Sequence, residues 1–213
     1  MTQIQSKIIP NLTHLSFLLG SKFTVPHQLV CDVFSNKFLF LRYVNLCCID
    51  EFTRHSWTIS SSLQFVSILS CQPTCIPAIL ASDPHLHHLQ VHVLHNNDDL
   101  VTSSSSLNHP LRRLILWSDS TALNFNDIDN ILIYTPNIEY LYLQTIYSMS
   151  FIDLAHGLIN RLHYLSQFDC YIKEMLYRDD RCGNLTTLHQ IHPCFNRIQF
   201  IEENNEFRTI ATK

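Results

Sequence analysis

The stretch TPNIEYLYL, from Thr135 to Leu143, places a proline just ahead of a run in which apolar side chains alternate with polar or aromatic ones. Proline has no amide proton and disfavours helix in the residue before it, so Pro136 should end a preceding helix and start a strand. Side chains in a strand point alternately to its two faces. We therefore predict that Ile138, Leu141 and Leu143 enter a core while the intervening tyrosines face the other way.

The same spacing of three apolar positions, which we call anchors, recurs along the chain. The copies are Leu12-x-x-Leu15-x-Phe17, Leu41-x-x-Val44-x-Leu46, Leu63-x-x-Val66-x-Ile68, Leu86-x-x-Leu89-x-Val91, Leu111-x-x-Leu114-x-Leu116, Ile138-x-x-Leu141-x-Leu143, Leu165-x-x-Phe168-x-Cys170 and Phe195-x-x-Ile198-x-Phe200. Prolines precede five of them, at Pro10, Pro84, Pro110, Pro136 and Pro193. Successive first anchors are about 22 to 30 residues apart, a period typical of repeat proteins. Because one such unit cannot bury its apolar face alone, we expect the copies to stack side by side.

Segments that fit short helices lie between the anchors, at residues 26–34, 77–81, 126–134, 151–159 and 185–191. In the third of them, Ile128, Ile131 and Leu132 share one helical face. The sequence therefore predicts an α/β fold, as one array over residues 1–213, in which a curved, mostly parallel sheet carries helices or irregular arcs on its convex side. We expect an exposed insertion loop at 96–109. A non-repeating α/β domain is the alternative.

Composition excludes several classes of function. The three glycines are far apart, so the chain has no glycine-rich phosphate loop and no G-x-S-x-G nucleophile elbow. The formal net charge of -4 gives no electrostatic reason to expect nucleic acid or an anionic membrane as partner. No apolar run approaches the roughly 20 residues of a membrane helix, and the eight cysteines fit reduced core thiols. We expect an intracellular protein, cytoplasmic or nuclear, with no nucleic-acid or membrane partner.

The segments PNLTHLSF, PHLHHLQV, HPLRRLIL and TPNIEYLYL resemble those of irregular leucine-rich-repeat proteins, in particular the substrate-binding tails of F-box proteins. This resemblance implies a leucine-rich-repeat-like solenoid that binds a protein, with substrate recognition for a ubiquitin ligase as its role. The chain departs from the regular pattern by having Asp119, Ile146 and Lys173 where an Asn or Cys would follow the third anchor. Because a repeat already begins by Pro10, we expect that an N-terminal F-box module is missing. Binding to the ligase adaptor is then not expected.

The predicted register suggests a binding surface, because residues between the anchors should point away from the core and align across neighbouring strands. The row before the second anchors contains His14, Tyr43, Phe65, His88, Arg113, Tyr140, Gln167 and Arg197. The row after them contains Ser16, Asn45, Ser67, Gln90, Ile115, Tyr142, Asp169 and Gln199. Since tyrosine, tryptophan and arginine dominate binding energy at interfaces, we predict that a protein partner contacts His88, His92, Arg113, Trp117, Tyr140, Tyr142 and Tyr171. The alternative is that these aromatics are ordinary packing, or that a helix buries them.

Histidine-containing segments raise the question of zinc. In the tract HLHHLQVHVLH at 85–95, strand geometry sets His88 and His92 about 13 Å apart, too far for one ion. A second set has suitable ligand types without a familiar spacing, at Cys182, His189, His192 and Cys194. Cys71 and Cys75 form only a lone pair. We expect no metal site, no cofactor and no catalytic residue, and predict a binding protein that is not an enzyme. An unidentified hydrolase-like or zinc-dependent activity is the alternative.

Overall fold

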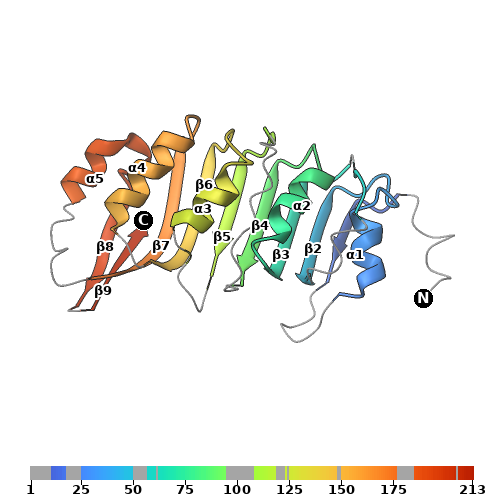
Figure 1. Ribbon diagram of the computed structural model, residues 1–213, viewed down its shortest axis with the longest axis horizontal. Helices are drawn as coiled ribbons and strands as arrows, with labels where there is room; N and C mark the ends of the chain where they lie inside the picture. The colour runs from blue at the N-terminus through green and yellow to red at the C-terminus, as the bar shows by residue number, and fades with distance from the viewer. Residues whose placement is uncertain are drawn as a thin grey trace.

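A computed structural model describes the chain at residues 11–17, 25–49, 57–60, 62–94, 108–118, 123, 125–147, 150–176, 185–204 and 206–213. Within these residues, nine strands form one sheet in the order β1-β2-β3-β4-β5-β6-β7-β9-β8. The strands are β1 (His14–Ser16), β2 (Tyr43–Cys48), β3 (Phe65–Cys71), β4 (His88–Val93), β5 (Arg113–Trp117), β6 (Tyr140–Tyr147), β7 (Gln167–Met175), β8 (Ile198–Glu203) and β9 (Phe207–Thr212). The helices are α1 (His27–Val33), α2 (Cys75–Ser82), α3 (Phe125–Leu132), α4 (Phe151–Arg161), α5 (Leu185–Ile191) and the 3-10 helix η2 (Pro193–Phe195). Figure 1 shows α1 to α5 along one face of the sheet.

The predicted register is confirmed from β1 to β7, which pair in parallel. Leu114, for example, lies between Leu89 and Leu141 in the ladder, and all three are buried. In β6, burial alternates residue by residue from Tyr140 to Tyr147. The anchors thus form the face of the sheet that packs on the helices in the hydrophobic core.

The predicted helices are present, with ends that differ by at most a few residues. The buried face of α3 consists of Ile128, Ile131 and Leu132, as the spacing predicted. Ser150 caps α4, because its hydroxyl accepts a hydrogen bond from the backbone N–H of Ile152 at 3.2 Å. Arg161 of α4 donates to both carboxylate oxygens of Asp129 in α3, at 2.8 and 2.7 Å. Helices α3 and α4 are therefore joined to each other as well as to the sheet.

The C-terminal strands depart from the prediction. The last anchor copy, residues 195–200, is predicted beside β7, but β9 lies between β7 and β8 and runs antiparallel to both. A turn explains the reversal, because Asn204 Oδ1 accepts hydrogen bonds from the backbone N–H groups of Glu206 and Phe207, at 2.9 and 2.8 Å. The predicted alignment of Arg197 with the strand next to it is therefore wrong.

Most of the predicted insertion loop at 96–109 lies outside the described residues, as does Pro10. At the end of this loop Asn108 is exposed but His109 is buried. The exposed character expected for the loop therefore does not extend to His109.

Polar residues precede the recurring prolines at the described turns, namely Asp83, His109, Thr135 and His192. His109 Nδ1 accepts a hydrogen bond from the backbone N–H of Leu111 at 3.1 Å, and His192 Nδ1 accepts one from Cys194 at 3.3 Å. Because Nδ1 is the acceptor in a neutral His109 ring, Nε2 carries the proton and donates to the Asp83 carbonyl oxygen at 2.9 Å. This buried histidine therefore joins two successive proline turns.

The carboxyl group of Asp83 is buried beside Ser82. Ser82 Oγ lies 2.9 Å from the Ile79 carbonyl oxygen and 3.1 Å from Asp83 Oδ2. A hydroxyl has one proton, so both contacts can be hydrogen bonds if Ser82 donates to Ile79 and a protonated Asp83 donates to Ser82. Burial raises the pKa of Asp83 from 3.8 to about 8, although the hydroxyl groups of Ser82 and Ser60 act in the opposite direction. Asp83 is therefore mostly neutral at pH 7.

Replacing Asp83 by Asn tests this assignment. The unfolded chain loses the Asp83 proton near pH 3.8, whereas the folded chain keeps it up to about pH 8. The wild-type free energy of unfolding therefore contains a contribution that falls as the pH rises through this interval, with a limiting slope of about 1.4 kcal/mol per pH unit. Asp83→Asn removes this contribution, so urea unfolding should show the variant gaining stability relative to wild type between about pH 4 and pH 8. Parallel pH profiles of the two proteins would contradict a buried, protonated Asp83.

Candidate functional site

The outer sheet face is the side of the sheet that points away from the helices. Its first row runs in register from β1 to β7 and consists of His14, Tyr43, Phe65, His88, Arg113, Tyr140 and Gln167. Its second row consists of Ser16, Asn45, Ser67, Gln90, Ile115, Tyr142 and Asp169. Its third row consists of His92, Trp117, Gln144 and Tyr171. The seven residues predicted to contact a partner all lie in these rows, so the structure brings them onto one face.

The first row begins as a series of touching rings. The ring centroids of His14 and Tyr43 are 4.4 Å apart and the two rings are stacked. Tyr43 is followed by Phe65 at 6.2 Å, and Phe65 by His88 at 4.4 Å in an edge-to-face contact. Such aromatic contacts are worth about 0.5–1.5 kcal/mol beyond the burial of area. The rings therefore hold one another in place across four strands.

Arg113 continues the row next to these rings. Its guanidinium carbon lies 4.1 Å from the centroid of the Tyr140 ring, which is a cation–π contact. In the third row, the His92 ring stacks on Trp117 with 6.0 Å between centroids. The side chains at the centre of the outer face are thus preorganised before any partner binds.

Asp169 organises the β7 side of the outer face. It accepts a hydrogen bond from Gln167 Nε2 at 2.8 Å and pairs with Arg197 Nη1 at 3.2 Å. The predicted alignment placed Arg197 beside Gln167. In the structure, Arg197 lies beside Asp169 instead. Burial, then the charge of Asp169 and a hydrogen bond to it, raise the pKa of Tyr140, and burial also raises the pKa of Tyr142. Both phenols remain protonated at neutral pH.

His88 is neutral at neutral pH. Its Nε2 atom is buried and has no hydrogen-bond partner among the described residues. Burial, and secondarily the positive charge of Arg113, lower the pKa of His88 from 6.5 to about 4. A second proton would add a charge to a half-buried ring beside a guanidinium. Arg113 therefore carries the positive charge of this part of the first row.

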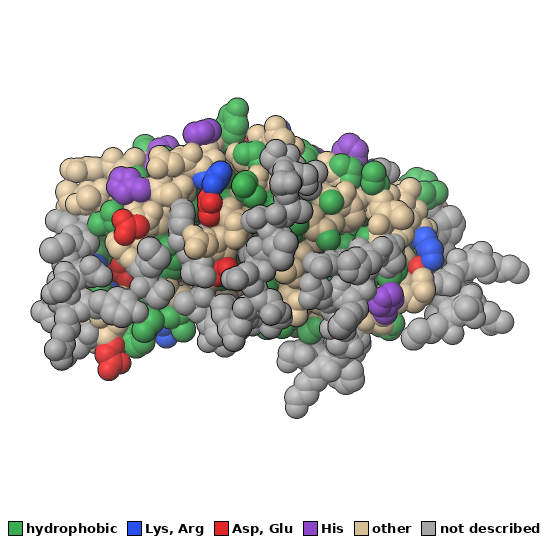
Figure 2. Space-filling view, in the orientation of Figure 1, with side chains coloured by type: hydrophobic (Ala, Val, Ile, Leu, Met, Phe, Trp, Pro, Cys, Tyr) green, Lys and Arg blue, Asp and Glu red, His purple; other side chains and the backbone are tan. Residues whose placement is uncertain are grey.

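Helices α1 to α5 do not cause the partial burial of the outer sheet face. The helices α1 to α5 lie on the opposite face, so none of them covers the outer sheet face (Figure 1). Arg113 is exposed, Tyr171 is 41% exposed, and the five other predicted contact residues are half-buried. Figure 2 views the helical side, where charged side chains of both signs are scattered among apolar and neutral ones.

The metal-ligand candidates have other roles in the described part of the chain. His189 Nε2 lies 3.2 Å from the carbonyl oxygen of Ile198, and His192 caps η2, while Cys182 lies outside the described residues. Burial, with smaller contributions from Cys75 and Cys48, raises the pKa of Cys71 well above its usual value, which disfavours a thiolate. Within the described residues, no group of three or more His, Cys, Asp or Glu side chains is arranged to hold a metal ion.

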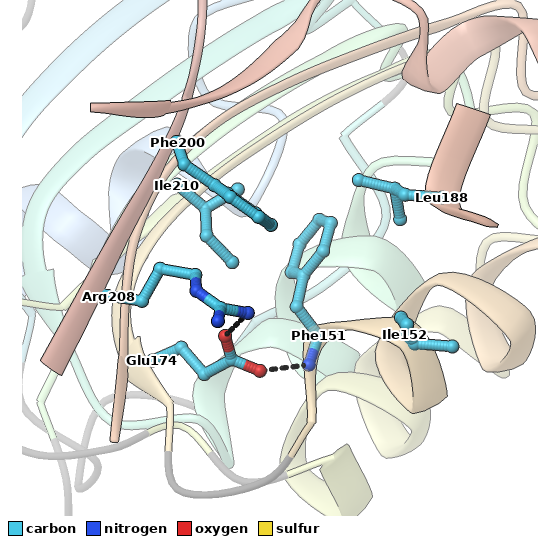
Figure 3. Close-up of a pocket in the computed structure, with 7 residues that line it drawn as sticks. All are labelled: Phe151, Ile152, Glu174, Leu188, Phe200, Arg208 and Ile210. Carbon is cyan, nitrogen blue, oxygen red and sulfur yellow. Dashed lines mark hydrogen bonds and ion pairs between the residues drawn. The ribbon is translucent and has the colours of Figure 1, made fainter. Parts of the chain in front are cut away.

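A polar cluster that sequence reasoning missed lies where α4 meets the β8–β9 hairpin (Figure 3). Glu174 Oε1 accepts a hydrogen bond from the Phe151 backbone N–H at 2.8 Å, and Glu174 Oε2 lies 3.6 Å from Arg208 Nη1. Arg208 also donates to Glu203 at 2.8 Å, and its guanidinium carbon lies 4.4 Å from the Phe200 ring centroid. This buried pair fastens β7 and β9 to the start of α4.

The cavity beside this cluster is too small for an organic ligand. Its other lining residues are Ile152, Leu188 and Ile210. The free space is about 10 Å³, which is enough for about one water molecule. No histidine lines it. The ion pair of Glu174 and Arg208 therefore fits a structural role, because the space beside it does not admit an organic ligand.

Comparisons with models of protein families, with curated proteins and with solved structures find no match. Among the described helices, none has both the length and the apolar character that crossing a bilayer requires. The assignment of function therefore depends on the geometry of the outer sheet face.

Titration of His88 tests the electrostatics of this face. The ring should titrate with a pKa of about 4 in the wild type when followed by NMR of the imidazole protons. Arg113→Ala should raise this pKa but leave it below 6.5, because burial is the larger cause of the shift. Arg112→Ala is the matched control, since its side chain pairs with Glu139 at 3.1 Å. An equal shift in both variants would mean that Arg113 has no specific effect on His88.

Proposed function

We propose that the chain is a leucine-rich-repeat-like solenoid whose outer sheet face binds another protein. The observation that carries this proposal is the first row, in which rings and a guanidinium touch or adjoin from His14 on β1 to Tyr140 on β6. Aromatic and arginine side chains supply most of the binding energy at protein interfaces. Side chains that are already held in place lose less entropy when a partner binds.

We further propose that the bound protein is a substrate, in keeping with the resemblance to the tails of F-box proteins. The chain would then supply recognition for ubiquitin transfer within the cell, and contact with the ligase adaptor would require an F-box. A catalytic function would instead need a pocket with convergent polar groups. The cavity beside Glu174 and Arg208 has room for about one water molecule, so it is not a pocket of this kind.

Site-specific photocrosslinking tests the binding role. Benzoylphenylalanine is introduced at Tyr142 on the outer face or at His156, which is exposed on α4. After irradiation in cells that express the protein, position 142 should give a discrete adduct with another protein, and position 156 should not. Mass spectrometry then identifies the adduct.

The adduct must also depend on the central side chains. Arg113→Ala combined with Trp117→Ala should remove it while urea unfolding still shows a cooperative transition, with a midpoint lowered by the loss of the Arg113–Tyr140 and His92–Trp117 contacts. Asp153→Ala combined with His156→Ala on α4 is the control and should leave the adduct from position 142 unchanged. An adduct from position 142 that survives the loss of Arg113 and Trp117 would contradict a binding site centred on these side chains, and the absence of any adduct from position 142 would contradict binding by this face.

A further inference from the structure

Arg113 lacks an ionic partner within the described residues, although its side chain is held in place. The guanidinium lies over the Tyr140 ring, and this contact uses its flat face. The N–H donors at its edge point in the plane of the group, where a carboxylate can accept two of them. The adjacent Arg112 differs, because Glu139 pairs with it at 3.1 Å. Arg113 is thus an exposed cation that is held in place by Tyr140. The contact with the ring does not use the N–H donors at the edge of the guanidinium group.

The neighbourhood of Arg113 defines what a complementary ligand must offer. His88, on the next strand, is uncharged at neutral pH because its pKa is about 4. Phe65 follows one strand further on, which places its ring about 10 Å from Arg113 at the usual strand spacing. A ligand that fits would carry a negative group and an apolar ring roughly 10 Å apart.

A protein segment fits this pattern better than a nucleic acid does. Nucleic acid requires a stripe of basic side chains along its phosphates. Among the described residues of the outer face, Arg197 pairs with Asp169 at 3.2 Å, and Lys173 lies on β7, two strands away from Arg113. These basic groups form no continuous stripe, and the chain has a formal net charge of -4. A protein segment with one carboxylate and one aromatic side chain can form an ion pair with Arg113. Unlike a nucleic acid, it does not place a chain of negative charges beside Asp169.

We infer that the outer sheet face takes an acidic segment of its partner, with a carboxylate bound to Arg113 and an aromatic side chain packed on Phe65 and His88. This inference rests on the proposed binding function of the face and specifies the chemistry of its partner. Arg113 would then determine specificity, because a neutral segment of the same shape leaves its donors without a charged acceptor.

Peptide binding tests the inference. The probe is a fluorescein-labelled peptide in which Asp-Ser-Phe-Gly occurs three times, so that in an extended chain each carboxylate and the ring two residues on, about 7 Å along the backbone, point to the same face. The comparison peptide has Asn in place of Asp. Fluorescence anisotropy should show the Asp peptide binding about tenfold more tightly than the Asn peptide, as expected for a hydrogen bond to a charged group. Arg113→Ala should remove this difference, and Arg112→Ala should change it less than about twofold.

The other outcomes overturn the inference and separate it from the proposed function. Equal binding of both peptides, or no binding of either at about 1 mM, excludes an acidic segment as the ligand. Tighter binding of a single-stranded oligothymidine than of the Asp peptide points to nucleic acid instead. In each of these cases the crosslinks from position 142 still decide independently whether the face binds a protein.

Discussion

The buried anchors of neighbouring parallel strands pack directly on one another, and every other feature depends on this registration. Leu89, Leu114 and Leu141 show it at the centre of the sheet, where all three are fully buried. Because side chains alternate along a strand, a shift of one residue would place the anchors outside and the tyrosines inside. The hydrophobic effect therefore fixes both the core and the composition of the opposite face. The prolines help by marking where the strand starts in the copies that have them.

The outer sheet face is a consequence of this registration and of a few local contacts. The pairing of β5 with β6 puts Arg113 beside Tyr140, and their cation–π contact then fixes both side chains. Burial keeps His88 neutral. At neutral pH the series of rings is therefore uncharged, and Arg113 beside it carries the positive charge. The physical case for protein binding depends on this combination of partly exposed rings and one oriented charge.

The sequence was sufficient to predict the parallel register, because the three anchors specify the face of each strand and, in five of the eight copies, a proline also marks where it starts. It did not predict the C-terminal hairpin. The anchors at 195–200 have the same spacing as the earlier copies, so they predicted one more parallel strand and gave no sign of the turn at Asn204. Turn chemistry at that asparagine was the available signal. Glu174 offered another signal, because it stands at a core-facing position two residues after Ile172 and so needs a buried partner.

Contacts that depend on side-chain conformation could not be read from spacing. Alternation put Arg113 and Tyr140 on one face, but whether the guanidinium would lie over the ring or pair with an acid depends on rotamers. The bonds of His109 were also hidden, because they connect two turns 26 residues apart in sequence. Sequence thus specified which face each residue occupies, and three-dimensional packing specified what it touches.

Hydroxyl-radical footprinting of the protein alone and with the partner identified by crosslinking tests the central claim most directly. The account predicts that Trp117, Tyr140 and Tyr142 react in the free protein and become protected in the complex. Tyr164, which is 65% exposed in the loop between α4 and β7, should react equally in both. Protection of Tyr164 without protection of the outer face would contradict the account.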